Sequence, residues 1–204
     1  MRPGTVCPNT RCSPLNEIRT LSAPQYGWAP GDFRLWSPRM AVTYSSAPTE
    51  DQLEQAADLV DSGGQLAAKL DRTKFRRSSV LVVALDNGGT VVGAAAVKPR
   101  QGAIAETGYL IVRPDHRRQG IAEQLTERRI DEARRKGIAL LFSNVRRDNE
   151  PSIGNLRKTK FQHWGDFVSA YGTDHVISWF YCSLDPNRDA HADLKNLTDG
   201  LKRV

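Results

Sequence analysis

A basic, glycine-bearing turn stands between an apolar, strand-like run and a helical run in the middle of this 204-residue chain. The turn spans residues 112–122 and reads Val-Arg-Pro-Asp-His-Arg-Arg-Gln-Gly-Ile-Ala. Backbone N–H groups at the start of a helix point at one spot, and the helix dipole adds positive potential there. Arg117 and Arg118 supply mobile charge, while Gly120 and Ala122 let a ligand approach the backbone closely. The turn therefore predicts a binding site for a pyrophosphate, such as that of a phosphorylated carrier.

The same turn carries a family signature. Arg117-x-x-Gly120-x-Ala122 resembles the acyl-CoA-binding pattern Gln/Arg-x-x-Gly-x-Gly/Ala of the GNAT superfamily of N-acetyltransferases. Glu106 lies 11 residues before Arg117, where members of the family with a glutamate general base carry it. Two elements thus occur in the order and spacing of the family.

A third element follows downstream and sets the extent of the resemblance. Asn149-x-x-Ser152-Ile153, with Phe161 twelve residues after Asn149, is similar to the family segment Asn-x-x-Ala/Ser-Ile…Gly-Phe. The resemblance covers residues 40–184. It implies a mixed, mostly antiparallel central sheet flanked by helices, the acyl-CoA N-acyltransferase fold of the α/β class. It also implies an N-acetyltransferase with acetyl-CoA as co-substrate, in which a primary amine attacks the thioester directly in a ternary complex.

The resemblance assigns roles to individual residues. Glu106 is the expected general base, although a salt bridge at a strand end explains a carboxylate there equally well. Strand alternation predicts that Glu106, Gly108, Leu110 and Val112 lie on one face. For Asn149 we expect a contact with the pantetheine arm rather than a helix cap. The expected cofactor contacts are Leu110, Ile111, Val112, Arg117, Arg118, Gln119, Gly120, Ile121, Ala122 and Asn149.

The general acid is where the chain departs from the family. Many members carry a tyrosine seven residues after the motif Asn, and here that position is Leu156; the Gly before the final Phe is Lys160. Ser152 is the catalytic candidate on this side, with helix capping as its alternative role. Tyr109 and Tyr171 are further proton donors. The departures also leave open an acyl-CoA-binding sensor without catalysis.

Composition bounds the remaining classes. A chain of 204 residues with 39% apolar content predicts one domain with extensions. We expect an irregular arm over 1–38, the acetyltransferase domain over 39–185 and a tail with a weak helix over 186–204. No run approaches 18 apolar residues, and the start lacks the apolar segment of a secretory signal, so no membrane association is expected. Three cysteines without zinc-finger spacing predict free thiols, no metal site and a cytoplasmic location.

The net charge of +6 bears on partners. Basic residues crowd the helix over 121–136, which we interpret as a solvated face interleaved with acids. A second group, Arg72, Lys74, Arg76 and Arg77, stands beside few acids in the sequence and disfavours a polycationic acceptor. A small-molecule or protein amine is the preferred acceptor. A nucleic-acid-linked amine is the less favoured alternative, and a homodimer is left open.

Hydrophobic periodicity predicts the order of elements. Thr49 is the expected N-cap of the first helix, since two acidic residues follow it. The predicted strands and helices are a strand at 40–44, helices at 50–61 and 65–70, strands at 79–85, 90–98 and 105–112, a helix at 121–135, a strand at 138–145, a helix at 151–159, a final hairpin of 167–171 with 176–184, and a tail helix through Leu194, Leu197 and Leu201.

Overall fold

The computed structural model describes residues 41–63, 69–170 and 175–204. The expected arm over 1–38, nearly all of the short helix over 65–70 and the turn at 172–174 lie outside these ranges. Within them, none of the helices combines the length and the apolar character needed to cross a membrane.

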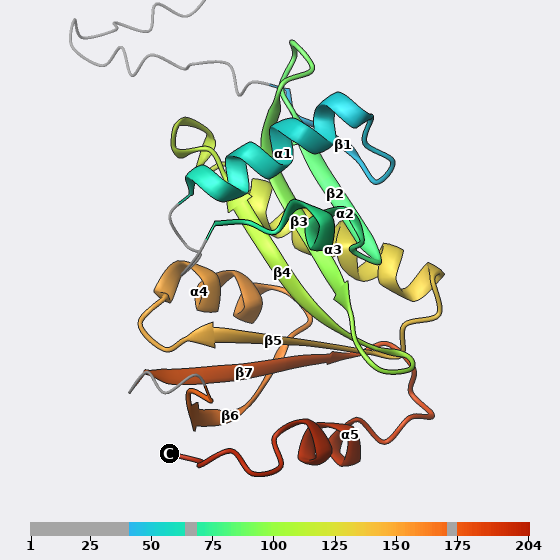
Figure 1. The fold of residues 1–204 in the computed structure, drawn as a ribbon, viewed down its shortest axis with the longest axis vertical. Helices are drawn as coiled ribbons and strands as arrows, with labels where there is room; N and C mark the ends of the chain where they lie inside the picture. The colour runs from blue at the N-terminus through green and yellow to red at the C-terminus, as the bar shows by residue number, and fades with distance from the viewer. Residues whose placement is uncertain (1–40, 64–68, 171–174) are drawn as a thin grey trace, which may run out of the picture. The chain divides into compact units, whose positions relative to one another are not determined.

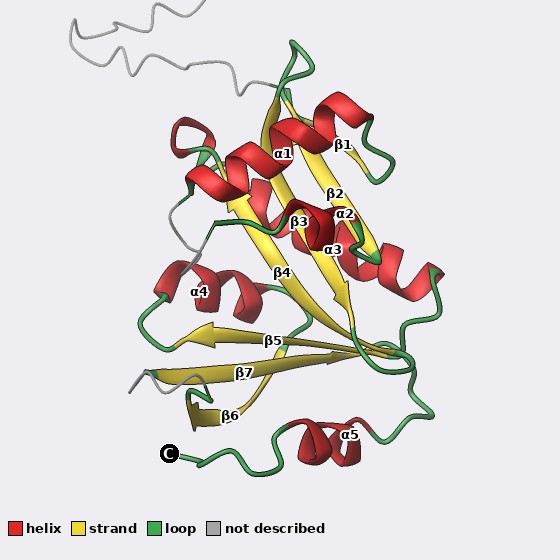
Figure 2. Cartoon of the chain, in the orientation of Figure 1, coloured by secondary structure: helices red, strands yellow, loops and turns green. Residues whose placement is uncertain are grey.

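The centre of the fold is a mixed sheet that, within the described residues, has seven strands in the order β1-β2-β3-β4-β5-β7-β6 (Figures 1 and 2). Only β4 and β5 pair in parallel, and every other neighbouring pair is antiparallel. The expected fold class is therefore confirmed. The strands are β1 (Thr43–Ser45), β2 (Val80–Leu85), β3 (Val91–Pro99), β4 (Ile104–Val112), β5 (Leu140–Arg146), β6 (Gln162–Val168) and β7 (Val176–Ser183).

Helices cover both faces of this sheet. One face packs against α3 (Ile121–Arg135) and α4 (Glu150–Lys158), whose apolar residues share a core cluster with Val82, Val97 and Leu141 of the strands. The opposite face of β2, β3 and β4 packs against α1 (Glu50–Ser62) and the short α2 (Arg72–Arg76). Strands β2 and β3 are buried on both faces, which explains their nearly unbroken apolar sequences.

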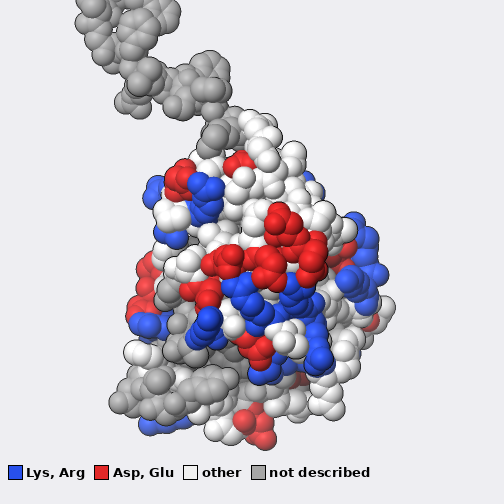
Figure 3. Space-filling model, turned by 45° about the horizontal axis from the view of Figure 1, so that its top comes forward, with Lys and Arg blue, Asp and Glu red and all other residues white. Residues whose placement is uncertain are grey.

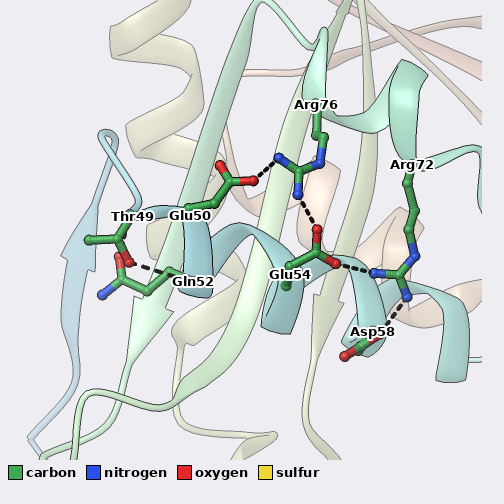
Figure 4. Close-up of polar contacts among 7 residues, drawn as sticks. All are labelled: Thr49, Glu50, Gln52, Glu54, Asp58, Arg72 and Arg76. Carbon is green, nitrogen blue, oxygen red and sulfur yellow. Dashed lines mark hydrogen bonds and ion pairs between the residues drawn. The ribbon is translucent and has the colours of Figure 1, made fainter.

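The first helix begins where the sequence predicts. The Thr49 hydroxyl accepts a hydrogen bond from the Gln52 N–H (3.3 Å), and the Gln52 side chain accepts one from the Thr49 N–H (3.0 Å), as Figure 4 shows in part. This reciprocal capping box satisfies two backbone donors that a helix start leaves unpaired. Thr49 is thus confirmed as the N-cap of α1.

Acids on α1 pair with the two arginines of α2 (Figure 4). Arg72 pairs with Glu54 (2.6 Å) and with Asp58, while Arg76 pairs with Glu50 and with Glu54. The expectation that these arginines stand beside few acids is therefore wrong, because the acids come from a helix some 20 residues earlier in the chain. On the face drawn in Figure 3, acidic and basic side chains lie in adjoining groups rather than in one basic surface.

Strands β4 and β5 part soon after they meet. Their parallel pairing covers only 104–106 against 140–142, although both strands continue beyond it, β4 to Val112 and β5 to Arg146. Past this point the facing backbone edges have no strand partner, so their polar groups remain available to other donors and acceptors. Figure 1 shows the two halves of the sheet diverging from this junction.

A β-bulge in β4 changes which side chains share a face. Its register against β3 shifts between Ala94 and Ala96, and Tyr109 takes a left-handed φ of 53°. The expectation of one shared face for Glu106, Gly108, Leu110 and Val112 is therefore wrong. Glu106 is the cross-strand partner of Lys98 on the α1 side, while Val112 belongs to the core cluster under α3.

Packing holds Tyr109 in this unfavourable conformation. Its ring meets the ring of Phe75 edge to face (5.3 Å between centroids), and the ammonium of Lys98 lies 5.1 Å from the ring centre. Phe75 is itself fully buried, so α2 fixes the bulge from one side of the sheet. Strained residues of this kind persist only where their surroundings determine them, and they concentrate at functional sites.

The C-terminal residues pack onto the domain. Strand β6 begins at Gln162, earlier than the sequence predicts, and pairs with β7. Helix α5 (Ala190–Leu197) then places the fully buried Leu194 in a third core cluster with Leu140 and Phe142 of β5. This burial explains the apolar spacing of the expected tail helix.

Leu194→Ala should lower the free energy of unfolding by about 2–5 kcal/mol, because it leaves a cavity in a closed core. Lys195→Ala, which changes an exposed residue of the same helix, is the control and should alter stability by less than about 0.5 kcal/mol. Urea titration of both variants measures the difference. Equal stabilities would mean that α5 does not contribute to the folded unit.

Candidate active site

The basic turn builds one wall of a cleft of about 590 Å³. Its other wall is α4, so the cleft lies between the start of α3 and the start of α4. Gly154 and Lys158 of α4 line the cleft together with nine of the ten expected cofactor contacts. These nine are Leu110, Ile111, Val112, Arg117, Arg118, Gly120, Ile121, Ala122 and Asn149. Of the expected set, Gln119 alone is not among the residues lining the cleft.

The backbone of the turn presents donors to this cleft. Arg118 and Gly120 take left-handed φ angles of 63° and 82°, so the chain curls before α3 begins. The first hydrogen bond of α3 runs from the Gln124 N–H to the Gly120 carbonyl (3.1 Å), and Gly120 has no side chain to cap the helix. The N–H groups of the first turn consequently remain available to an anion.

Side-chain hydrogen bonds also hold the turn between β4 and α3 in place. The Arg117 Nε donates to the Val112 carbonyl oxygen (3.0 Å), which anchors the guanidinium at the mouth of the cleft. His116 is buried, and its Nδ1 lies 2.8 Å from Asp115 Oδ1. The neighbouring Arg113 guanidinium and His116 together lower the pKa of Asp115 to about 2. Asp115 therefore stays ionised and keeps its hold on both partners.

A second cavity, of about 750 Å³, opens where β4 and β5 part. It shares Leu110, Asn149 and Ser152 with the cleft, so the two spaces meet at these residues. A molecule in the cleft and a molecule in the cavity would accordingly meet beside β4. The cavity continues past Phe142 and Trp179 towards the C-terminal segment, and its aromatic rings stack (5.2 Å between centroids).

Glu106 lies on the wall of this cavity with 4% of its surface exposed. The Lys98 ammonium donates to its Oε1 (2.8 Å), and Arg100 donates to its Oε2 from Nε (3.0 Å) and from a terminal nitrogen. The salt-bridge alternative for Glu106 is thus confirmed, and the residue also lines the cavity, so its role as a general base stays a prediction. Lys98 and Arg100, which hold it, were not singled out from the sequence.

The start of α4 brings the two motif residues together. Asn149 is the N-cap of this helix, and its Oδ1 accepts a hydrogen bond from the Ser152 N–H (3.3 Å). The capping role left open for Ser152 is therefore wrong, and so is the expectation that Asn149 does not cap a helix, because α4 begins at Glu150 and Asn149 is its N-cap. The expected contact of Asn149 with the pantetheine arm stays a prediction. Ser152 lines both cavities, and the Asn149 side-chain N–H₂ can still donate to a ligand.

Arg129 on α3 is a site residue that the sequence reasoning missed. Its side chain lines the larger cavity, yet only 2% of the residue is exposed. No hydrogen bond or ion pair joins its guanidinium to any residue that the structure describes, and burial lowers its pKa to about 10. The expectation of a wholly solvated basic face is therefore wrong for Arg129. Helical spacing in the sequence could have predicted that Arg129 is buried, since Ile121, Leu125 and Arg129 recur every four residues along one face of α3.

Comparisons with known proteins agree with this geometry. The model of the acetyltransferase (GNAT) family matches residues 38–161. An L-methionine sulfoximine/L-methionine sulfone acetyltransferase from Pseudomonas aeruginosa is 28% identical over 125 residues, which cover 58% of this chain and 73% of that protein.

Solved structures share the fold. The ribosomal-protein-S18-alanine N-acetyltransferase from Escherichia coli superposes with a TM-score of 0.59 at 22% identity, covering 74% of this chain and 98% of that one. A structure from Salmonella typhimurium with its cofactor acetyl-CoA gives a TM-score of 0.59 at 20% identity, covering 72% and 96%. The chain belongs to the GNAT acetyltransferase family, and it is an acetyl-CoA-dependent acetyltransferase.

Gly120→Glu should abolish binding of acetyl-CoA in calorimetry, because it strains a left-handed position and places a carboxylate where phosphates bind. Gly137→Glu is a matched control: this glycine has a φ of 73° and open space around it, but it stands just past the opposite end of α3. The control should retain binding. Equal loss in both variants would show that backbone strain, not the phosphate site, causes the effect.

Proposed function

We propose that this acetyltransferase acts on the primary amine of a small molecule, which binds in the cavity between β4 and β5 and attacks acetyl-CoA directly. The observation that carries the proposal is the meeting of the two cavities at Leu110, Asn149 and Ser152. The amine nitrogen forms a bond to the acetyl carbon, the carbon–sulfur bond breaks, and CoA leaves as a thiolate. The ammonium loses one proton to a base before the attack, and the second proton that the nitrogen sheds on becoming an amide goes to the departing thiolate or to water.

The cofactor would lie along β4 with its pyrophosphate at the start of α3. The N–H groups of that helix start and the guanidinium of Arg117 would hold the phosphates. The unpaired edge of β4 near Leu110 would bind the pantetheine amides and the thioester carbonyl, since backbone donors and acceptors there have lost β5 as a partner. Asn149 would add a side-chain donor at the same point.

Glu106 is proposed as the base, acting through a water molecule. Each of its oxygens already accepts from a cation, but a carboxylate oxygen carries more than one acceptor position. A water held by Glu106 could then take the proton of the incoming ammonium. Lys98 and Arg100 would keep the carboxylate in one orientation during the reaction.

Leu156 stands at the position where many family members carry a tyrosine as their general acid, and it is buried in the core. Ser152 is proposed to donate a hydrogen bond to the departing sulfur, since it lines both cavities where they meet. A thiolate is a stable leaving group, so this contribution should be smaller than that of Glu106.

Two observations favour a small acceptor over nucleic acid. The arginines of α2, which would have formed part of a basic surface, are paired with the acids of α1. The Pseudomonas aeruginosa relative is named for small amino-acid acceptors. We place the reaction in the cytoplasm, where cysteines stay reduced; Cys182 is a buried free thiol.

Glu106→Gln should lower kcat by about 10²–10⁴ with little change in acetyl-CoA binding, because it removes a positioned base while keeping the shape of the side chain. Ser152→Ala should have a smaller effect. Steady-state kinetics on an amine panel, together with calorimetry for acetyl-CoA, separates these contributions. An unchanged kcat in Glu106→Gln would mean that the amine loses its proton without help from this residue.

A further inference from the structure

A buried guanidinium without a partner is the most unusual feature of the larger cavity. Arg129 is 2% exposed, its Nε contacts no acceptor, and the described residues offer its remaining nitrogens no carboxylate. Burying an unpaired charge is costly, and natural proteins rarely keep one without a compensating use. An apolar side chain at this point of α3 would pack without that cost.

The surroundings of Arg129 are polar where the cavity reaches it. Thr107 pairs across the sheet with Val97, and Ser143 pairs with Phe180. Val97 and Phe180 belong to the core under α3. Because cross-strand partners share a face, the two hydroxyls lie on the Arg129 side of the sheet. They are 5% and 6% exposed, and both line the same cavity. A guanidinium and two hydroxyl groups therefore converge on the gap between β4 and β5.

Helix α4 is fixed beside this cluster. The Asn155 side-chain N–H₂ donates to the Thr126 hydroxyl (2.8 Å), and both residues are buried. Thr126 stands one turn before Arg129 on α3, so the bond ties the two helices together next to the guanidinium. The position of Arg129 is thereby set by the scaffold rather than by a flexible loop.

The charge balance of the cavity favours an anion. Lys98, Arg100, Arg129 and Arg146 line it, and among the described lining residues Glu106 carries the only carboxylate. Glu106 is occupied by Lys98 and Arg100 on the α1 side of β4, and Arg146 pairs with Asp148. No carboxylate of the described residues balances the charge of Arg129, so this guanidinium is left to pair with a ligand.

We infer that the acceptor carries a carboxylate close to its amine, as a free α-amino acid does, and that Arg129, Thr107 and Ser143 bind this carboxylate at the floor of the cavity. The inference rests on the proposed function and narrows it. A guanidinium matches a carboxylate with two parallel hydrogen bonds, which also orients the amine of the same molecule towards the thioester. The N-terminus of a protein has no such carboxylate, so the site favours a free small molecule.

The test compares L-methionine sulfone with its primary amide as acceptors. The amide has the less basic amine, so a larger fraction of it is unprotonated at neutral pH, and it should react faster unless the protein recognises the carboxylate. The wild-type protein should prefer the acid by about 10- to 100-fold in kcat/KM, the range expected for a charge-assisted, bidentate contact. Arg129→Met should remove this preference, and Arg129→Lys should keep part of it.

Arg128→Met is the matched control. Arg128 is the neighbouring residue of α3, is exposed and stacks on Tyr44 (4.6 Å), so this variant removes the same charge outside the cavity and should retain the preference. Thermal unfolding of Arg129→Met should occur at or above the wild-type temperature, because an unpaired buried charge has gone. A folded variant that has lost the preference thus separates recognition from stability.

Three outcomes would overturn the inference. The first is a wild type that acetylates the amide, or a peptide N-terminus, as fast as the acid. The second is an equal fall for acid and amide in Arg129→Met, which would place the guanidinium at the thioester instead. The third is a titration of L-methionine sulfone, L-methionine and L-phenylalanine into the CoA-saturated wild type that shows no binding. A protein that binds acetyl-CoA and these acids but acetylates no amine would instead contradict the proposed function.

Discussion

Strands β4 and β5 run side by side for three residue pairs and then separate, and this parting is the constraint on which the rest of the site depends. A sheet with continuous pairing would have no cavity at its centre and no unpaired backbone edge. Because the strands part, the edge of β4 becomes available to a cofactor, and the space beyond it becomes available to an acceptor. The bulge at Tyr109 belongs to the same arrangement, since it turns Leu110 and Val112 towards the α3 side just where β4 loses its partner.

The two regions that flank this opening use charge in opposite ways. On the outer surface, Arg72 and Arg76 each pair with two carboxylates of α1, so their charge is neutralised within the protein (Figure 4). Exposed pairs of this kind contribute little stability individually, but as a network they hold α2 under the bulge. Inside the cavity, Arg129 has no such partner among the residues that the structure describes. A basic residue count would treat these arginines alike, whereas their surroundings give them different roles.

The cofactor side and the acceptor side of the site also differ in how they depend on sequence. The proposed phosphate site would consist mostly of backbone N–H groups and needs only a glycine that tolerates a left-handed φ, with arginines nearby. Such a site depends on few side chains, so it should tolerate extensive substitution. The acceptor cavity is made of side chains from β4, β5, α3 and α4, so each substitution there alters what it can bind. Leu156 and Arg129 are both on that side.

Local sequence determined the elements and the cofactor turn. The Gly-bearing turn, the capping box of Thr49, the bounds of α3 and the buried runs of β2 and β3 all follow from patterns within a few residues, because helix starts, turns and strand faces are set by near neighbours. Asn149 and Ser152 were found the same way, although only the bounds of α4 showed which of the two caps the helix.

Tertiary structure decided what these elements do together. The pairing of α1 acids with α2 arginines joins residues about 20 positions apart, and the cations on Glu106 come from β3 and from the loop after it. The break in alternation at Tyr109 depends on Phe75 and Lys98, which no local pattern in β4 contains. Helical spacing already placed Arg129 on the buried stripe of α3. Only the parting of β4 from β5 put a cavity in front of it, because an empty space between two strands is a property of their pairing and not of either sequence.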